Sequence, residues 1–218
     1  MDILREGLSQ FQLNSEEELC QSLHCFASLI DQANETYGLV KAELPRLITH
    51  HILDSLSSVQ VLRKTNPRSS LIDIGSGAGL PGIPLALVMP EIKVTLLDRS
   101  KRRISFLRRA CQVLGLDNVE VIEAVFSEVQ VATFDVVTCR AMAPLSKLLP
   151  DFIQLRRSGR VVHANTTFLM YQGMKATVER EIYSIKSFDN QLKYRVVPVR
   201  VPYVDAERHL ILIKGFSG

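Results

Sequence analysis

This sequence of 218 residues has no long apolar run, although hydrophobic residues make up 46% of it and charged residues 22%. No stretch approaches the roughly 20 apolar residues that a membrane helix needs. The start is also unlike a secretory leader, because charges come as early as Asp2 and Arg5. The net charge of +3 is too small to establish a nucleic-acid partner. We therefore expect a soluble, cytoplasmic, monomeric protein with no membrane partner.

Cysteine is scarce and is not arranged for chemistry. Cys20, Cys25, Cys111 and Cys139 form no C-x-x-C pair and have no neighbouring histidine at metal-ligand spacing. The sequence also lacks internal repeats and low-complexity segments. We expect four reduced thiols, buried or half-buried, and no metal site.

The most informative segment is residues 71–79, Leu-Ile-Asp-Ile-Gly-Ser-Gly-Ala-Gly. An apolar run that contains Asp73 and breaks into Gly75, Gly77 and Gly79 is typical of a buried parallel strand that ends in a loop. In open α/β sheets, ligands bind at this carboxyl edge. Glycine permits the tight turn and lets the backbone approach the ligand closely.

The glycine spacing favours one ligand over another. A dinucleotide fingerprint, G-x-G-x-x-G, would need glycine where Leu80 stands, and here the third glycine comes one residue early. The form G-x-G-x-G after an acid is similar to the first motif of S-adenosylmethionine-dependent methyltransferases. We therefore expect a cofactor site formed by Asp73, Gly75, Gly77, Gly79 and Leu80, in which Asp73 could orient the loop without touching the ligand. An ordinary strand-to-helix turn is the alternative.

A second acid, Asp98, ends the β-rich run 93–98, one strand–helix–strand unit further along. A carboxylate at the tip of the second strand is expected to accept hydrogen bonds from the ribose hydroxyls of an adenosine. Asp98 alone would also fit NAD, so the glycine spacing decides between the two cofactors.

The pattern of the chain changes near residue 66. Apolar residues at helical spacing predict a first helix that includes residues 19–30 and a second over 44–62, with Pro45 in its first turn. We expect an N-terminal helical extension at 1–65, a connector at 65–69, and a methyltransferase core at 66–218.

In the core, predicted strands and helices alternate. The strands are expected at 69–74, 92–97, 118–123, 134–139, 159–164, 193–200 and 209–214. The helices are expected at about 81–89, with Pro81 at the first helical position, and at 100–114, 143–155 and 173–185. Alternation of this kind predicts an α/β, Rossmann-like fold with a mostly parallel seven-stranded sheet and helices on both faces. The last two strands should form an antiparallel hairpin.

A basic segment follows Asp98 directly. Arg99, Lys101, Arg102 and Arg103 lie beside the expected cofactor edge, on a helix whose other side is apolar. Such a helix can hold RNA phosphates while it packs on the sheet. The alternative is a solvated helix face without a ligand.

Several further segments carry a family resemblance. They are His51-Ile-Leu-Asp-Ser-Leu56, Asp73 to Pro84 with its Leu-Pro-Gly-Ile-Pro ending, Leu96-Leu-Asp98 with Lys101 to Arg103 and Phe106-Leu107, Phe134-Asp135 with Arg140-Ala141, and Glu207-Arg-His-Leu210 with Ile213-Lys214. Over nearly its whole length the sequence resembles the RsmG (GidB) family of bacterial methyltransferases, which modify N7 of a guanine in small-subunit (16S) ribosomal RNA.

The resemblance implies a class I methyltransferase with S-adenosyl-L-methionine as cofactor, and ribosomal RNA or a ribosomal particle as partner. It implies a methyl-donor site at Gly75, Leu80, Asp98, the Phe126-Ser127 pair and Arg140. The target nucleotide, and the choice between free RNA and an assembled particle, do not follow from the sequence.

Guanine N7 carries a lone pair and no proton, so its methylation needs no general base. Most of the rate enhancement should come from holding the reacting atoms in line. Arg140 is the preferred catalytic residue, because its guanidinium could bridge the cofactor edge and the guanine, for example at O6. The alternative for Arg140 is a structural salt bridge to Asp54 or Asp73.

Other polar residues have weaker assignments. His50 and His51 are expected to cap or pack between the helical region and the core, with RNA contact as the alternative, and Asp54 and Ser55 to fix the same junction. The segment Glu207-Arg208-His209 could close a hydrogen-bond network under the cofactor edge or form a surface turn.

One segment departs from the family pattern. A Leu-Lys-Gly segment usually follows the fifth strand, but residues 161–167 contain no lysine at that place, and Asn165 and Thr166 could supply hydrogen bonds instead. Two other functions therefore stay open. One is a methyltransferase acting on another RNA or a small molecule. The other is a non-catalytic RNA-binding or ribosome assembly factor. An NAD-dependent oxidoreductase is disfavoured by Leu80.

Overall fold

The computed structural model describes residues 1–65, 70–140, 144–188 and 192–214. The predicted connector, and with it the boundary between the two predicted domains, falls at residues 66–69, outside this described part. Three other residues with predicted roles also lie outside it: Ser69 of the strand expected at 69–74, Ala141 of the Arg140-Ala141 motif, and Ala143 of the helix expected at 143–155. Within the described part, no helix has the length and apolar character that crossing a membrane requires.

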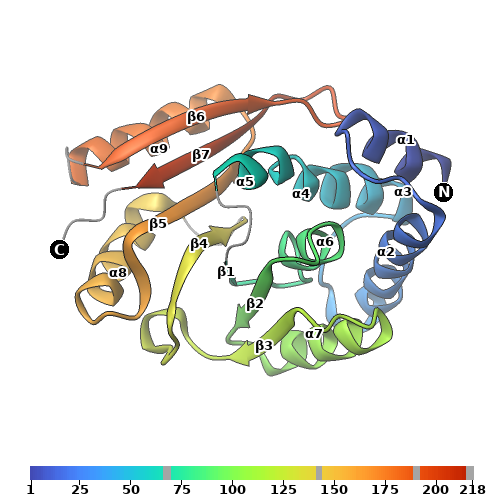
Figure 1. Ribbon diagram of the computed structural model, residues 1–218, viewed down its shortest axis with the longest axis horizontal. Helices are drawn as coiled ribbons and strands as arrows, with labels where there is room; N and C mark the ends of the chain where they lie inside the picture. Colours follow the sequence, from blue (N-terminus) through green and yellow to red (C-terminus); the bar gives the residue numbers. More distant parts are fainter. Residues whose placement is uncertain (66–69, 141–143, 189–191, 215–218) are drawn as a thin grey trace.

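The centre of the fold is one sheet of seven strands (Figure 1). The strands are β1 (Ser70–Ile74), β2 (Lys93–Asp98), β3 (Val119–Glu123), β4 (Thr133–Cys139), β5 (Val161–Gln172), β6 (Lys193–Val199) and β7 (Arg208–Lys214). Their order is β3-β2-β1-β4-β5-β7-β6. The first five are parallel, and β7 runs antiparallel to both β5 and β6. The predicted fold class and the predicted terminal hairpin are confirmed.

The two faces of the sheet pack into separate hydrophobic cores because side chains alternate along each strand. In β1, Leu71 belongs to a core shared with α6 (Gly82–Val88) and α7 (Lys101–Val113). Its neighbour Ile72 belongs to the core under α8 (Leu145–Arg157) and α9 (Lys175–Phe188). By this alternation Asp73 points to the same side as Leu71, toward α6.

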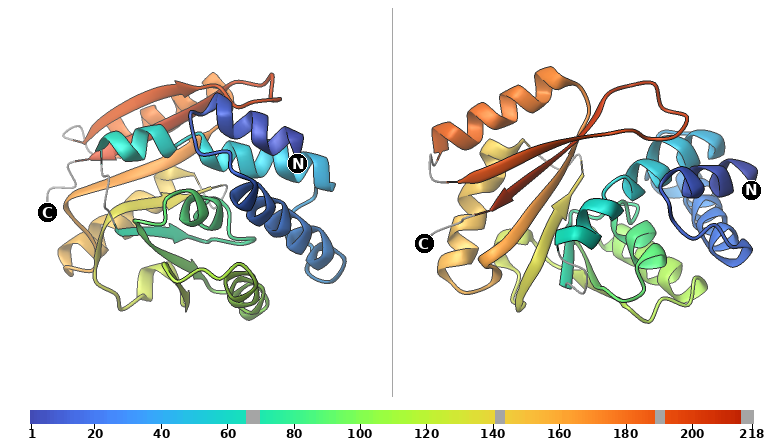
Figure 2. Two further views of the ribbon diagram at one scale, coloured as in Figure 1. Left: turned by 45° about the vertical axis from the view of Figure 1, so that its right-hand side comes forward. Right: turned by 45° about the horizontal axis from the view of Figure 1, so that its top comes forward.

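The N-terminal residues form more helices than the sequence predicts. They are α1 (Asp2–Gln10), α2 (Glu17–Tyr37), α3 (Leu44–Leu47), the π-helix η1 (Ile48–Leu53), α4 (Asp54–Leu56) and α5 (Val59–Thr65). The predicted helix 44–62 is thus broken into four segments. These helices share the core of α6 and α7, and α2 lies beside both (Figures 1 and 2). The helical extension is therefore packed against the sheet-covering layer.

Strand β5 is much longer than the predicted strand 159–164. The polar residues Asn165 to Thr167 suggested a loop, but the strand continues to Gln172, with an irregular register beside Phe134 and Val136 of β4. Thr166 is accommodated because its hydroxyl donates to the Phe134 carbonyl at 2.7 Å. Residues 161–167, which were expected to include the segment that follows the fifth strand, therefore all lie within β5, and the residues that follow the strand start at Gly173.

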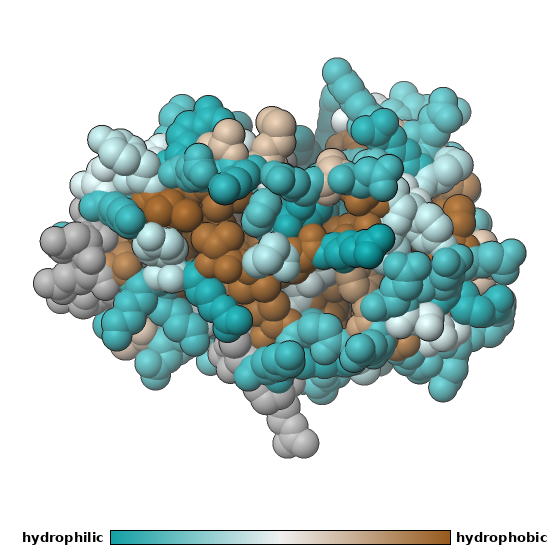
Figure 3. Space-filling model, turned by 90° about the horizontal axis from the view of Figure 1, so that it is seen from above, coloured by the Kyte–Doolittle hydropathy of each residue, from teal (hydrophilic) through white to brown (hydrophobic). Residues whose placement is uncertain are grey.

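Strand β6 is the edge of the sheet and lies along the upper side of the molecule. Its residues Val196, Val197 and Val199 are only half-buried. Seen from above, a band of hydrophobic residues crosses this otherwise mostly hydrophilic side (Figure 3). Elsewhere the cysteines take the expected positions: three are buried, and Cys25 is half-buried.

Candidate active site

The glycine loop after β1 takes a backbone path that favours glycine. Gly75, Gly77 and Gly79 have φ angles of 66°, 59° and 83°, in the left-handed region. The Gly77 N–H donates to Asp98 Oδ2 at 3.0 Å, and the Ser100 N–H donates to Asp98 Oδ1 at 2.9 Å. Asp98, at the tip of β2, therefore fixes both the loop and the start of α7.

Asp73, in the strand before the glycine loop, binds the residues that follow the loop. Its Oδ2 accepts the Gly82 N–H at 3.0 Å, at the first residue of α6. A Cβ atom at Gly82 would collide with Leu96 and Asp73, so only glycine fits there. Asp73 is completely buried, and this burial raises the pKa of its carboxyl group to about 7. Helix α6 starts one residue later than expected, because Pro81 is its N-cap rather than its first residue.

A cavity of about 430 Å³ opens at the carboxyl ends of β1 and β2. Four of the predicted cofactor residues line it: Gly75, Asp98, Phe126 and Arg140. Phe126 comes from the 3-10 helix η2 (Phe126–Glu128), and Ala124 and Val125 add apolar wall. A carboxylate beside an apolar wall suits the ribose and adenine parts of a nucleoside.

The other predicted cofactor residues do not line this cavity. Gly77 donates a hydrogen bond to Asp98, which does line the cavity, and Asp73 accepts a hydrogen bond from Gly82 after the loop. Leu80 is buried in the core, and the Cα of Gly79 faces Ile83 and Leu107. These residues shape the loop instead.

Arg140 follows β4 and is held by the N-terminal helices. Its Nη1 donates to the His51 carbonyl at 3.2 Å and lies 3.3 Å from Asp54 Oδ2, and its Nη2 lies 3.1 Å from His51 Nδ1. The salt bridge to Asp54, one alternative from the sequence, is present. Burial, with the Arg140 charge second, lowers the pKa of His51 to about 4, so its ring is neutral at pH 7 and Nδ1 can accept the Arg140 hydrogen bond.

Asp54 also binds a second arginine from a distant part of the chain. Its Oδ1 accepts from Arg208 Nε at 3.0 Å, while Oδ2 faces Arg140. The Asp54 side chain is 11% exposed, so both pairs are shielded from water. Asp54 thus joins the N-terminal helices to the end of β4 and the start of β7. The sequence predicts this role for Asp54 at the junction.

Hydrogen bonds of Tyr171 strengthen the same junction. The Tyr171 hydroxyl lies 2.6 Å from Ser58 Oγ and donates to the Ser55 carbonyl at 2.8 Å. His209 Nδ1 lies 2.9 Å from the Gly173 carbonyl, and Glu207 Oε2 accepts the Lys175 N–H at 3.1 Å. Residues 207–209 are therefore hydrogen-bonded, but none of them lines the cofactor cavity, and Glu207 is exposed.

A second cavity, of about 580 Å³, meets the cofactor cavity at Arg140, which lines both. Its walls come from the junction, from β5 and β7, and from α9. They include Asp54, Tyr171, Gln172, Glu181, Arg208 and His209. The motifs did not point to Glu181, because it sits in an amphipathic helix of mixed charge.

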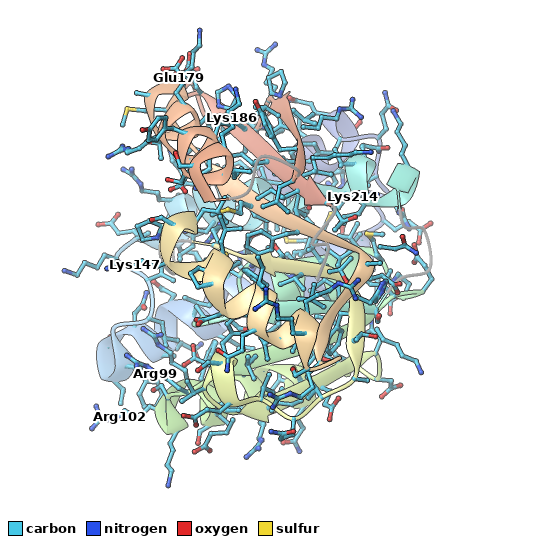
Figure 4. All side chains as sticks on the ribbon, turned by 90° about the vertical axis from the view of Figure 1, so that its left-hand side faces the viewer. Arg99, Arg102, Lys147, Glu179, Lys186 and Lys214 are labelled. Atoms are coloured by element: carbon cyan, nitrogen blue, oxygen red, sulfur yellow. The ribbon has the colours of Figure 1, made fainter. Side chains whose placement is uncertain are left out.

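The predicted basic residues divide into two groups. Arg99 and Arg103 line the cofactor cavity, and Arg103 lies 3.4 Å from Asp98. Lys101 and Arg102 are exposed. Lys147 of α8, which the sequence did not single out, projects on the same side of the molecule as Arg99 and Arg102 (Figure 4).

The strand order, the glycine loop and the carboxylate at the tip of β2 define an S-adenosylmethionine-dependent methyltransferase. Solved structures support this class. A methyltransferase structure from Methanococcus maripaludis superposes with a TM-score of 0.60 at 13% identity, covering 89% of this chain and 94% of that one. The mitomycin 7-O-methyltransferase MmcR gives 0.55 at 15% identity, covering 75% and 53%. At these identities, the likeness concerns the fold alone.

The sequence comparison is more specific. The family model described as rRNA small subunit methyltransferase G matches residues 19–211. Proteins named ribosomal RNA small subunit methyltransferase G are 34% identical in Coxiella burnetii (strain RSA 331), covering 99% of this chain and 98% of that relative, and 34% identical in Chromobacterium violaceum, covering 95% and 94%. The chain belongs to this family.

Replacing Gly77 by valine should abolish cofactor binding. A β-branched residue is strained at a φ of 59°, so the loop must move and the bond from Gly77 to Asp98 is lost. Calorimetric titration with S-adenosylmethionine measures the loss. Gly115→Val is the matched control, because Gly115 also has a positive φ, of 63°, and open space around it, but lies between α7 and β3, outside the glycine loop. Equal affinities of folded Gly77→Val and wild-type protein would contradict the expectation.

Asp73→Asn should change how stability depends on pH. The pKa of Asp73 is about 7 in the folded protein and 3.8 in the unfolded chain. The stability that protonated Asp73 contributes is therefore fully present below pH 3.8 and is lost as pH rises through 7. The free energy of unfolding of Asp73→Asn, relative to wild type, should therefore increase between pH 4 and pH 7.5, by up to roughly 4 kcal/mol at 1.36 kcal/mol per pKa unit. Urea titrations of both proteins across this range measure it. A difference that stays constant with pH would refute the raised pKa.

Proposed function

We propose that this protein transfers a methyl group from S-adenosyl-L-methionine to N7 of a guanine in small-subunit (16S) ribosomal RNA. The observation that carries the proposal is that Arg140 lines both a nucleoside-type cavity and a larger cavity, in a chain of this family. One cavity suits the methyl donor, and the neighbouring cavity suits the acceptor.

The residues of the smaller cavity would hold the cofactor by complementary chemistry. Asp98 Oδ2 accepts from both the Gly77 N–H and Arg103, whereas Oδ1 accepts only the Ser100 N–H and, as a carboxylate oxygen, can accept a further bond from a ribose hydroxyl. Phe126 offers apolar surface for the adenine ring. The bound cofactor supplies an electrophilic methyl group on a positively charged sulfur.

The acceptor step needs positioning rather than proton transfer. Guanine N7 has a lone pair and no proton, so no residue has to act as a base. Arg140 is the proposed catalytic residue, and the guanidinium N–H groups that His51, Asp54 and Ser55 leave unoccupied would donate to the base. Contacts to guanine O6 would orient the base while N7 stays free to react. Because Asp54 and His51 hold the guanidinium, its orientation is set before the base arrives.

The exposed cations beside the cofactor edge would bind RNA phosphates. Arg102 at the start of α7 and Lys147 at the start of α8 project on the same side of the molecule (Figure 4), and Lys101, next to Arg102, is exposed. We include both the free RNA and the assembled ribosomal particle among the substrates to be tested. The protein would act in the cytoplasm, where that RNA resides.

A methylation assay tests the proposal. The purified protein, labelled S-adenosylmethionine, and either free small-subunit RNA or the assembled subunit from cells lacking this protein are combined. Mass mapping then locates the product. We expect 7-methylguanosine at one site. A methyl group found on another atom, or only on another RNA, would contradict the proposed substrate. Cofactor binding without methyl transfer would favour the alternative of a non-catalytic assembly factor.

The pair Lys101→Glu and Arg102→Glu should weaken RNA binding and flatten its salt dependence. Two phosphate contacts correspond to a change of about 2 in the slope of log affinity against log salt. Fluorescence anisotropy between 50 and 200 mM salt measures the slope, and cofactor affinity should not change.

The matched control is Lys93→Glu with Lys214→Glu. It makes the same charge change at the start of β2 and the end of β7, on the opposite edge of the sheet, and Lys214 points away from Arg102 in Figure 4. An equal loss in both pairs would mean that only net charge matters. Arg103→Glu does not serve here, because Arg103 contacts Asp98 in the cofactor cavity.

A further inference from the structure

The larger cavity contains a buried carboxylate that the proposed methyl transfer does not use. Glu181 of α9 lines the cavity, and the residue is only 7% exposed. Its Oε2 accepts the Leu145 N–H at 2.9 Å, at the first residue of α8. The start of α8 and the helix α9 are thereby tied together, and the position of the carboxylate in the cavity wall is fixed.

A negative charge at this place is unexpected for contact with an RNA backbone. Phosphates are repelled by a carboxylate, whereas the N–H groups of a base are attracted to it. The cavity volume, about 580 Å³, lies within the range of about 300–1,000 Å³ that is usual for small-molecule sites. A single base that has left its stack is a ligand of this kind.

Among the bases, guanine has the edge that suits a carboxylate. Its Watson–Crick edge presents two neighbouring donors, N1–H and the N2 amino group, whereas adenine presents an acceptor at N1. A carboxylate has several acceptor sites and can serve both guanine donors. A guanine held by this edge leaves O6 and N7 on its other edge, free to face Arg140, which lines the same cavity.

We propose that this cavity receives the flipped-out target guanine and that Glu181 selects guanine by accepting hydrogen bonds from its N1–H and N2 amino group. The inference rests on the proposed function and extends it, because it assigns the residue that reads the base. Arg208, held by Asp54 on the wall formed by β7, encloses the base from another side.

The test combines one protein variant with one RNA variant. Glu181→Gln keeps a side-chain oxygen for the Leu145 N–H but places an amino group where the second acceptor stood. Inosine at the mapped target position lacks only the N2 amino group and keeps N1–H, O6 and N7. For the wild type, we expect kcat/KM to fall roughly 10- to 100-fold from guanosine to inosine.

For Glu181→Gln, we expect kcat/KM on guanosine RNA to fall by a similar factor. The preference for guanosine over inosine should shrink to about threefold or less, with unchanged affinity for S-adenosylmethionine. Glu179→Gln is the matched control, because Glu179 is exposed on the same helix and should behave as wild type (Figure 4). A role of Glu181 confined to the start of α8 would leave the preference between the two bases unaltered.

The outcomes separate this inference from the proposed function. If the wild type methylates guanosine and inosine equally well, or if Glu181→Gln retains the full preference, Glu181 does not read the base and the inference is wrong while the methyl transfer stands. If the wild type methylates no guanosine, both fail. The wild-type comparison needs no variant, so it decides even if Glu181→Gln does not fold.

Discussion

The two ion pairs of Asp54 are the interaction on which the active site depends. One carboxylate, 11% exposed, faces Arg140 after β4 and Arg208 at the start of β7. Removing one partner of a buried pair typically costs roughly 3–5 kcal/mol, because the other charge stays buried without compensation. Here, replacing Asp54 alone would leave two guanidinium groups without their carboxylate partner. The N-terminal helices therefore form part of the candidate site and are not merely attached to it.

This junction also explains how one arginine can serve two cavities. A long side chain between two open spaces would normally sample several rotamers, and holding it in one of them costs conformational entropy. The contacts of Arg140 with His51, Asp54 and Ser55 meet that cost in the folded protein. His51 contributes as a neutral acceptor, since its low pKa avoids a third positive charge. The guanidinium is then in place before either ligand binds.

The sequence predicts the parts of the site that are local in the chain, but it finds few of those that depend on long-range packing, although the salt bridge between Arg140 and Asp54 was one of its alternatives. The glycine loop and Asp98 are recognisable because strand, turn and acid follow one another. The pairing of Asp54 with Arg208 is not, because the two residues are distant in sequence and meet only when β7 inserts beside β5. The length of β5 was likewise underestimated, because the hydrogen-bond partner of its polar residue Thr166 is Phe134, on another strand. Glu181 carried no motif, and only the fold shows that it faces a cavity.

The distribution of charge follows from what each ligand requires. The carboxyl groups of Asp73, Asp98, Asp54 and Glu181 are buried, and each accepts N–H groups of a loop, a helix start or an arginine. Inside the site, carboxyl oxygens thus order loops, helix starts and arginines. On the surface the cations are left exposed, so they attract phosphate over a distance of about 8 to 10 Å at ordinary salt. In the proposed function, this long-range attraction would bring the RNA to the edge of the sheet. Discrimination between bases requires short hydrogen bonds in a shielded place, so we assign it to Glu181 and Arg140 inside.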